Sequence, residues 1–370
     1  MIIGAGVVGL AVGWRLAEAG ERVVVFEQGT AGRGTSWQAA GMLAPDAEIG
    51  FEELKLYALS RESLRRWPAF ADELEAASGQ DVDLRTEGTF VVADDPDSAA
   101  ALRRLYDFQQ EQGLDVEWLS PEAALEREPF LAPRLAAAVF TPADYQVDNR
   151  RLVEALRTAF EAAGGTLREE TPVAAVHPGA EDGPERPAVT AERDDGTTER
   201  VEARAVVVAA GVGTRNIDGL EAIPAVRPVK GQMIELKAAR PFALDHVVRG
   251  PDAYLAPKSD GRLLVGATSE ERGFDTRVTA GGLFELLEGA RDVVPGVDEL
   301  EVTGTWAGLR PAARDNAPLL GESGLPGVVM ATGHYRHGVL LTPATADEIA
   351  RLVLDGETSR WIAPFSPVRF

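Results

Sequence analysis

Three glycines near the start of the chain, Gly4, Gly6 and Gly9, have the spacing of a turn that binds the phosphates of a dinucleotide. In such a turn the first glycine makes the tight bend, the second lets the backbone approach the pyrophosphate, and the third lets the next helix lie close to the sheet. The N-terminus of that helix offers N–H groups to the phosphates. Glu27 follows at a spacing suited to accept hydrogen bonds from ribose hydroxyls, and its charge disfavours the 2′-phosphate of NADP.

The elements that must position these glycines are present in the right order. An apolar strand at Met1–Ile3, a helix at Leu10–Ala19 and a second apolar strand at Val23–Phe26 surround the turn. A signal peptide is the alternative for this apolar start, but no basic segment precedes it, and Arg15 lies within the helix. Only three residues precede Gly4, whereas a central strand has about five, so we expect that the natural chain starts upstream or has been trimmed.

Two side chains far along the sequence could bind a small carboxylate. Arg310 presents a planar fork that matches a carboxylate, and Tyr254 could donate a further hydrogen bond. The alternative for Arg310 is a structural ion pair. The alternative for Tyr254 is a buried hydroxyl bonded to a core carbonyl.

Two further segments could lie against a large flat ligand. Thr35–Leu43 is rich in small residues, which let a backbone pass close to such a ligand, although an ordinary Ala-rich helix start is the alternative. The polar loop Gly333–Gly338 precedes a helix predicted from Pro343. A plain turn is its alternative; the functional interpretation is that its N–H groups and the helix stabilise negative charge on the ligand.

Composition excludes several classes of function. The chain of 370 residues has 45% hydrophobic and 26% charged residues, which indicates a soluble globular protein, and we expect it in the cytoplasm. Its net charge of −22 argues against binding to nucleic acid or to anionic membranes. Without cysteine there is no disulfide and no cysteine zinc site, and we expect no metal, because His334 and His337 lack a third ligand.

Hydrophobic periodicity and turn residues predict an alternation of helices and strands. Predicted helices are 52–78, kinked or split at Pro68, then 98–112, one starting at Ser120, 148–163, 281–291 and 343–354. Predicted strands are 89–93, 136–140, 203–211, 226–236, 254–257, 262–267, 301–309 and 327–331, with a surface hairpin over 179–196.

These elements predict an α/β fold with a discontinuous Rossmann-like domain of the two-dinucleotide-binding type and a second, β-rich domain that binds substrate. The first domain would comprise residues 1–85, 141–222 and 310–370, and the second residues 86–140 and 223–309. The buried strand that runs into Gly211 is typical of such flavoproteins.

Nearly the whole chain resembles the D-amino-acid-oxidase superfamily of FAD enzymes and, within it, the glycine oxidases of thiamine biosynthesis. The resemblance is carried by Gly4–Gly9, Thr35–Leu43, Pro228–Gly231, Trp306–Pro311 and Gly333–Leu341. The last two stretches are the most specific, because the glycine motif is common to many flavoproteins.

The resemblance implies non-covalent FAD between the two domains. The substrate contacts that it implies are Tyr254, Arg310 and Arg336. Together with the glycine motif, it implies cofactor contacts at Gly4, Gly6, Val7, Val8, Gly9, Glu27, Gln28, Thr35, Ser36, Ala40, Gly41, Met42, Val173, His334, Tyr335, Arg336, His337, Gly338, Val339 and Leu340. The chain departs from the family at His337, where asparagine is usual, and at Asp252, where histidine is frequent. An imidazole at position 337 could alter the flavin potential.

The implied reaction is oxidation of glycine and other small amines, such as sarcosine and small D-amino acids. A hydride passes from Cα to flavin N5, and the imine then gives glyoxylate, ammonia and hydrogen peroxide; dehydroglycine would supply the thiazole of thiamine. In such a reaction the protein mainly orients the substrate and supplies electrostatic stabilisation. Molecular oxygen is the expected acceptor, and a homo-oligomer is expected.

Two alternatives remain open. One is a D-amino-acid or proline dehydrogenase that passes electrons to a quinone, which would favour a membrane-binding stretch. The other is a flavin-binding module without oxidase activity, such as a partner in tRNA modification, which the charge of −22 disfavours.

Overall fold

Strand β1 (Ile2–Ile3) lies inside a six-stranded sheet in the computed structural model, which describes residues 1–180, 184–193, 195–238 and 240–370. The order is β18-β19-β12-β1-β2-β8, parallel except for β18. The other strands of this sheet are β2 (Val24–Phe26), β8 (Thr166–Arg168), β12 (Val206–Val208), β18 (Leu319–Glu322) and β19 (Val328–Thr332).

Short runs of buried aliphatic residues build this sheet because both of its faces are covered. Ile2 belongs to a core formed with the helices on one face, whereas Ile3 belongs to the core on the other face. The helices are α1 (Val7–Glu18), α3 (Leu54–Ser78), α6 (Asn149–Ala162) and α8 (Thr342–Asp355). The opposite face packs against an antiparallel sheet of β9 (Val173–His177), β10 (Ala188–Glu192) and β11 (Thr198–Glu202).

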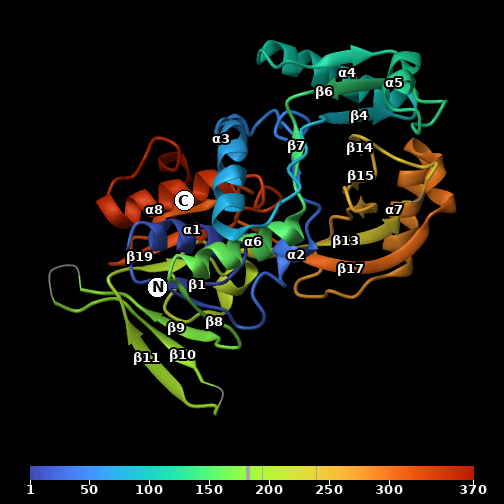
Figure 1. The fold of residues 1–370 in the computed structure, drawn as a ribbon. Helices are drawn as coiled ribbons and strands as arrows, with labels where there is room; N and C mark the ends of the chain where they lie inside the picture. Colours follow the sequence, from blue (N-terminus) through green and yellow to red (C-terminus); the bar gives the residue numbers. More distant parts are fainter. Residues whose placement is uncertain (181–183, 194, 239) are drawn as a thin grey trace.

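An eight-stranded sheet lies beside the first, in the order β17-β13-β16-β15-β14-β4-β6-β5 (Figure 1). Its strands are β4 (Thr89–Ala93), β5 (Glu117–Leu119), β6 (Ala137–Thr141), β13 (Arg227–Lys237), β14 (Val247–Arg249), β15 (Tyr254–Pro257), β16 (Arg262–Gly266) and β17 (Glu301–Ala312). Helix α7 (Ala280–Val293) packs on one face through Leu286 and Val293. Met233 and Ala256 pack instead with Ala40, which lies in the segment that joins the two units.

The remaining elements connect or flank these sheets. They are α2 (Thr35–Gln38), α4 (Pro96–Glu111), α5 (Pro121–Arg127), the pair β3 (Met42–Leu43) and β7 (Tyr145–Gln146), and three 3₁₀ turns at Gly211–Asn216, Pro295–Glu299 and Ala363–Phe365. Helix α2 packs against both α6 and β17, so it lies where the two units meet (Figure 1).

The predicted α/β class with a β-rich second region is confirmed, and most predicted elements occur within a few residues of their predicted ends. Pro68 was expected to kink or split α3; it lies inside one continuous helix, so the split is wrong. The predicted hairpin over 179–196 includes residues 181–183 and 194, which lie outside the described residues; within it, β10 pairs with β9 and β11. Residues 1–85, 141–222 and 310–370 supply the six-stranded sheet, whereas the eight-stranded sheet uses the other two segments, with β6 and β17 crossing the proposed limits.

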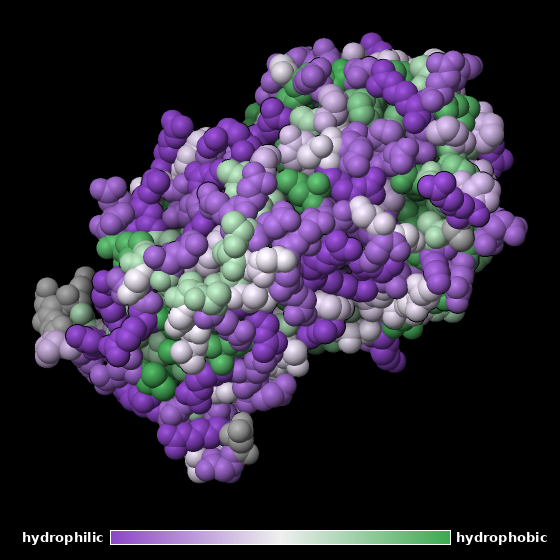
Figure 2. Space-filling model, in the orientation of Figure 1, coloured by the Kyte–Doolittle hydropathy of each residue, from purple (hydrophilic) through white to green (hydrophobic). Residues whose placement is uncertain are grey.

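Hydrophilic side chains dominate the face in Figure 2, as the excess of acidic residues would suggest. In the part of the chain that the structure describes, no helix combines the length and the apolar character needed to cross a membrane.

Candidate active site

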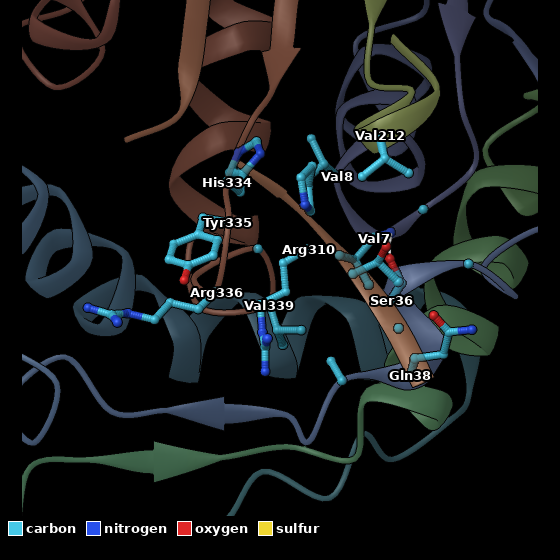
Figure 3. A pocket seen from close by; sticks show the side chains of 18 of the residues that line it. Val7, Val8, Ser36, Gln38, Val212, Arg310, His334, Tyr335, Arg336 and Val339 are labelled. Carbon is cyan, nitrogen blue, oxygen red and sulfur yellow. Dashed lines mark hydrogen bonds between the residues drawn. The ribbon is translucent and has the colours of Figure 1, made fainter. Parts of the chain in front are cut away.

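A cavity of about 770 Å³ lies between the two units and is lined by segments from both (Figure 3). The predicted site residues that line it are Gly4, Gly6, Val7, Val8, Glu27, Gln28, Thr35, Ser36, Ala40, Gly41, Met42, Val173, Tyr254, Arg310 and all residues from His334 to Leu340. Of the predicted set, Gly9 alone is missing from this lining. The structure thus brings together residues that the sequence separates by more than 300 positions.

The glycine turn has the geometry that its spacing predicts. Gly4 adopts φ +99°, and a Cβ there would lie 2.6 Å from the carbonyl oxygen of Ala209. A Cβ on Gly9 would lie 1.9 Å from the carbonyl oxygen of Gly4, so Gly9 lets α1 approach the turn and faces the protein rather than the cavity. Helix α1 begins at Val7, with Gly6 before it as the cap residue.

Glu27 follows β2 and connects the glycine turn to the segment after β2. Its Oε2 accepts a hydrogen bond from Ala5 N at 2.8 Å, and its Oε1 accepts one from Gly29 N at 3.1 Å. A carboxylate oxygen can accept more than one hydrogen bond, and Glu27 also lines the cavity. It can therefore hold the turn and still accept a ligand hydroxyl.

The segment of small residues begins as the short helix α2 and continues as extended backbone. Ser36 Oγ accepts from Val7 N at 3.1 Å, which ties this segment to the start of α1. Gly41 has φ +77°, and a Cβ there would lie 2.1 Å from the carbonyl oxygen of Val147. The cavity wall is therefore backbone at this point, as expected for close approach to a flat ligand.

A buried lysine supports that wall from behind. Lys258 Nζ donates to Ala40 O at 2.7 Å, to Val147 O at 2.8 Å and to Gln146 Oε1 at 3.2 Å. Burial lowers the pKa of Lys258 to about 7. Lys258 directly follows β15, so its hydrogen bonds connect the β-rich sheet to the wall of small residues.

The loop from His334 to Leu340 closes the cavity and leads into α8. His334 Nε2 lies 3.0 Å from Thr345 Oγ1, and burial lowers the pKa of His334 to about 3. Burial also lowers the pKa of His337 to about 4, although Glu48 acts in the opposite direction. Both imidazoles are therefore neutral near pH 7 and add no positive charge to the cavity.

Arg310 lies flat on the β-rich sheet because its neighbours are glycines. A Cβ on Gly231 would lie 2.5 Å from Arg310 Nη2. Arg310 Nη1 donates to Thr268 O at 3.0 Å, and none of the carboxylates in the described residues forms a salt bridge with this guanidinium. The described residues therefore provide no ionic partner for Arg310, which argues against a structural ion pair. Its guanidinium remains available to an anionic ligand.

Tyr254 lies near Arg310 and is held as a neutral phenol. Its hydroxyl donates to Met233 Sδ at 3.3 Å, and a Cβ on Gly266 would come within 2.6 Å of the hydroxyl oxygen. Burial raises the pKa of Tyr254 to about 12, against the opposing effect of Arg310. Thioethers are weak acceptors, so the hydroxyl could turn to a ligand at little cost.

Arg336 is placed differently from Arg310. Its Nη2 donates to Glu53 Oε2 at 3.3 Å, and 37% of its side chain is exposed. In Figure 3 the side chain extends away from Arg310 and Val339, towards the rim. Of the three predicted substrate contacts, the structure therefore groups Arg310 with Tyr254 and leaves Arg336 at the edge.

Sequence reasoning missed several charged residues of this cavity. Glu48 and Arg249 line it and are in direct ionic contact with each other, and Lys258 lies behind its wall. Glu48 lies just after the small-residue segment, which was one available signal, whereas Arg249 ends a three-residue strand that the periodicity did not predict.

The residues present fit a flavin dinucleotide. The backbone at positions 4, 6 and 41 lines the cavity, and glycine is required at 4 and 41 because a Cβ there would meet backbone oxygens of the protein. Glu27 offers an acceptor beside the glycine turn, and the cavity continues from there to Arg310.

Comparisons with known proteins agree with this fit. The model of the family described as FAD dependent oxidoreductase matches residues 1–352. A glycine oxidase of Geobacillus kaustophilus is 38% identical over 100% of this chain and 96% of its own length. The crystal structure of glycine oxidase from that organism matches with a TM-score of 0.91 and covers 100% of this chain and 98% of that chain. The bifunctional protein ThiO/ThiG of Synechocystis is 33% identical over 100% of this chain and 54% of its own length. The chain therefore belongs to the family of FAD dependent oxidoreductases.

Proposed function

We propose that this enzyme oxidises glycine and other small amino acids and amines with molecular oxygen. The observation that supports this most directly is Arg310, a cavity-lining guanidinium to which no carboxylate of the described residues is paired. A planar fork of this kind matches a substrate carboxylate in two parallel hydrogen bonds. The similarity to glycine oxidases supports the choice of substrate.

The protein residues would act by orientation. Arg310 would bind the carboxylate, and Tyr254 would donate a further hydrogen bond as a neutral phenol. FAD, once bound, would supply the redox chemistry of the reaction, because a flavin can take up a hydride. We propose non-covalent FAD, held by the glycine turn, Glu27, the 35–42 segment and the 334–340 loop.

The overall reaction would consume one amino acid, one oxygen and one water. Glycine loses a hydride and a proton as the C=N bond forms, and water then replaces the imine nitrogen to give glyoxylate and ammonia. Oxygen takes the two electrons and two protons and leaves as hydrogen peroxide. We further propose that the imine serves the thiazole of thiamine, which the relative named ThiO/ThiG supports.

A peroxide assay tests this proposal. Purified enzyme is given glycine, sarcosine, D-alanine and D-proline, each in air and, without oxygen, with a quinone dye. Peroxide formed with glycine or sarcosine in air is the expected result. Turnover with the dye alone would instead favour the dehydrogenase alternative, and no turnover with any amine would overturn the proposal.

A further inference from the structure

A buried carboxylate, Glu48, lines the same end of the cavity as Arg310. Only 11% of its side chain is exposed. Arg249 Nη1 donates to Oε1, whereas the nearest basic groups to Oε2 are beyond hydrogen-bond distance: Arg336 Nε at 4.0 Å and the neutral imidazole of His337, whose Nδ1 lies at 3.8 Å. None of the described residues donates a hydrogen bond to Oε2, which leaves this oxygen free to accept one in the cavity.

Glu48 carries a negative charge at neutral pH. Burial alone would raise the pKa of its carboxyl, but the surrounding cations, led by Arg249, outweigh burial and lower the pKa. An ionised carboxylate oxygen that lines a cavity and has no donor from the described residues can accept a strong hydrogen bond from a ligand that reaches it. The free oxygen therefore matches a ligand that brings N–H groups.

Glu48 and Arg310 lie at the same part of the cavity, because Arg249, which contacts Glu48, is the direct cross-strand partner of Tyr254. Both Arg310 and Glu48 act on the pKa of Tyr254, the former lowering it and the latter raising it. The cavity thus offers a cation and an anion near the same phenol. An α-amino acid, with its carboxylate and its amino group on one carbon, has the complementary pair.

The position of Glu48 is built into the fold. Asp46 and Ala47 directly precede Glu48, and the backbone N–H of each donates a hydrogen bond to the carboxyl group of Asp144, at 3.1 and 3.0 Å. Asp46 is itself held by Tyr57 and Arg61, at 2.9 and 2.6 Å. The loop that carries Glu48 is therefore fixed by buried hydrogen bonds.

We propose that Glu48 binds the amino group of the substrate through Oε2 and so selects amino acids over carboxylates that lack an amine. This inference rests on the proposed function, in which Arg310 holds the carboxylate. An amino group can donate N–H to Glu48 both as the ammonium that enters from solution and as the neutral amine that reacts. Glu48 is then a substrate-binding residue.

The substitution Glu48→Gln separates this role from a structural one, because it keeps the size and one oxygen acceptor for Arg249. The affinity for acetate, which is glycine without its amino group, is measured from the change in flavin absorbance. The KM for glycine should rise at least tenfold, whereas the Kd for acetate should stay the same or fall, because Arg249 loses its anionic partner. Glu53→Gln is the control: it removes a carboxylate from the rim that pairs with Arg336, and should change both constants less than threefold.

Two results would overturn the inference: an unchanged KM for glycine, or a loss of glycine and acetate affinity by the same factor. The failure of the proposed function is recognised separately, because the wild type would then produce no peroxide from glycine. If the wild type prefers another amino acid, that amino acid and its deaminated analogue replace glycine and acetate in the same comparison.

Discussion

At the Gly4–Gly9 end of the cavity the ligand would meet mostly backbone and small side chains, whereas at the Arg310 end it would meet charges. The backbone end comes from a few continuous stretches, 4–9 and 35–42 among them. The charged end draws its residues from three separate parts of the chain: Glu48, the neighbouring strands that carry Arg249 and Tyr254, and Arg310. The difference suggests that the first end sets affinity for a cofactor and the second sets which substrate reacts.

Removing the cation at the charged end should have the largest effect. Arg310→Ala should lower kcat/KM for glycine. The corresponding loss of transition-state stabilisation should be about 2–5 kcal/mol, because the buried carboxylate of the substrate loses its partner. FAD content should remain that of the wild type, since Arg310 lies at the other end of the cavity. Steady-state kinetics at matched flavin absorbance would measure this; wild-type kcat/KM in the variant would show that Arg310 is structural.

The same contrast explains how much the sequence could predict. The glycine turn and Glu27 were predictable because their spacing along the chain sets their geometry, whereas the 334–340 loop was identified through its family motif. Arg310 was identified through its motif, but the glycine beneath it at position 231 comes from another strand. Its lack of an ionic partner in the described structure depends on packing that no local pattern encodes.

Glu48 and Arg249 show where prediction from sequence ends. Each is one acidic or basic residue among many, and Arg249 is brought into place by the pairing of β14 with both β4 and β15. Short strands such as β3 and β8 were missed for a related reason, since two or three residues carry no periodicity. The predicted domain limits and the roles of the site residues remain proposals.

Lys258 links the β-rich sheet to the wall of small residues, and its titration should affect stability. Burial lowers its pKa to about 7 in the folded protein, while an unfolded lysine titrates near 10.4. Between these values only the unfolded chain binds the proton, so this group makes stability rise with pH, on the order of 1 kcal/mol per pH unit. Lys258→Met should lack this contribution. Thermal unfolding of both proteins from pH 6.5 to 9.5 measures the effect: the stability of the wild type should rise with pH relative to that of Lys258→Met. A stability difference that stays constant over this range would contradict the prediction.

At the backbone end, Glu27→Ala should weaken FAD binding by roughly 1.5–3 kcal/mol, the size of a hydrogen bond to a charged group. The variant also loses the acceptors for Ala5 N and Gly29 N, so the turn is less well held. Glu27→Gln keeps the oxygen that Ala5 or Gly29 needs and should lose less. Titration of the apoprotein with FAD measures both, and an unchanged Kd in Glu27→Ala would exclude Glu27 as a ribose ligand.

Gly9→Ala tests the close approach of α1 to the turn. The new Cβ would lie 1.9 Å from a backbone oxygen, so the helix must move, at a cost of about 1–3 kcal/mol. Lower thermal stability and lower FAD content should appear together. Gly281→Ala is the matched control, because nothing lies within 4 Å of a Cβ there and alanine favours the helix. Equal stability of the two variants would mean that the turn tolerates a side chain at position 9.

The smallest effect should come from Arg336, the other arginine predicted to contact the substrate. Arg336 forms an ion pair with Glu53 at the rim, and exposed ion pairs of this kind contribute about 0–1 kcal/mol to stability. Its side chain points away from Arg310, so Arg336→Ala should change kcat/KM for glycine by no more than a few fold (Figure 3). The comparison with Arg310→Ala is informative in either direction. If Arg336→Ala loses as much activity as Arg310→Ala at full flavin content, then Arg336 must leave Glu53 and turn inward when substrate binds. The carboxylate would then be held by two arginines, and the charged end of the cavity would change its shape with each turnover, whereas the backbone end would not.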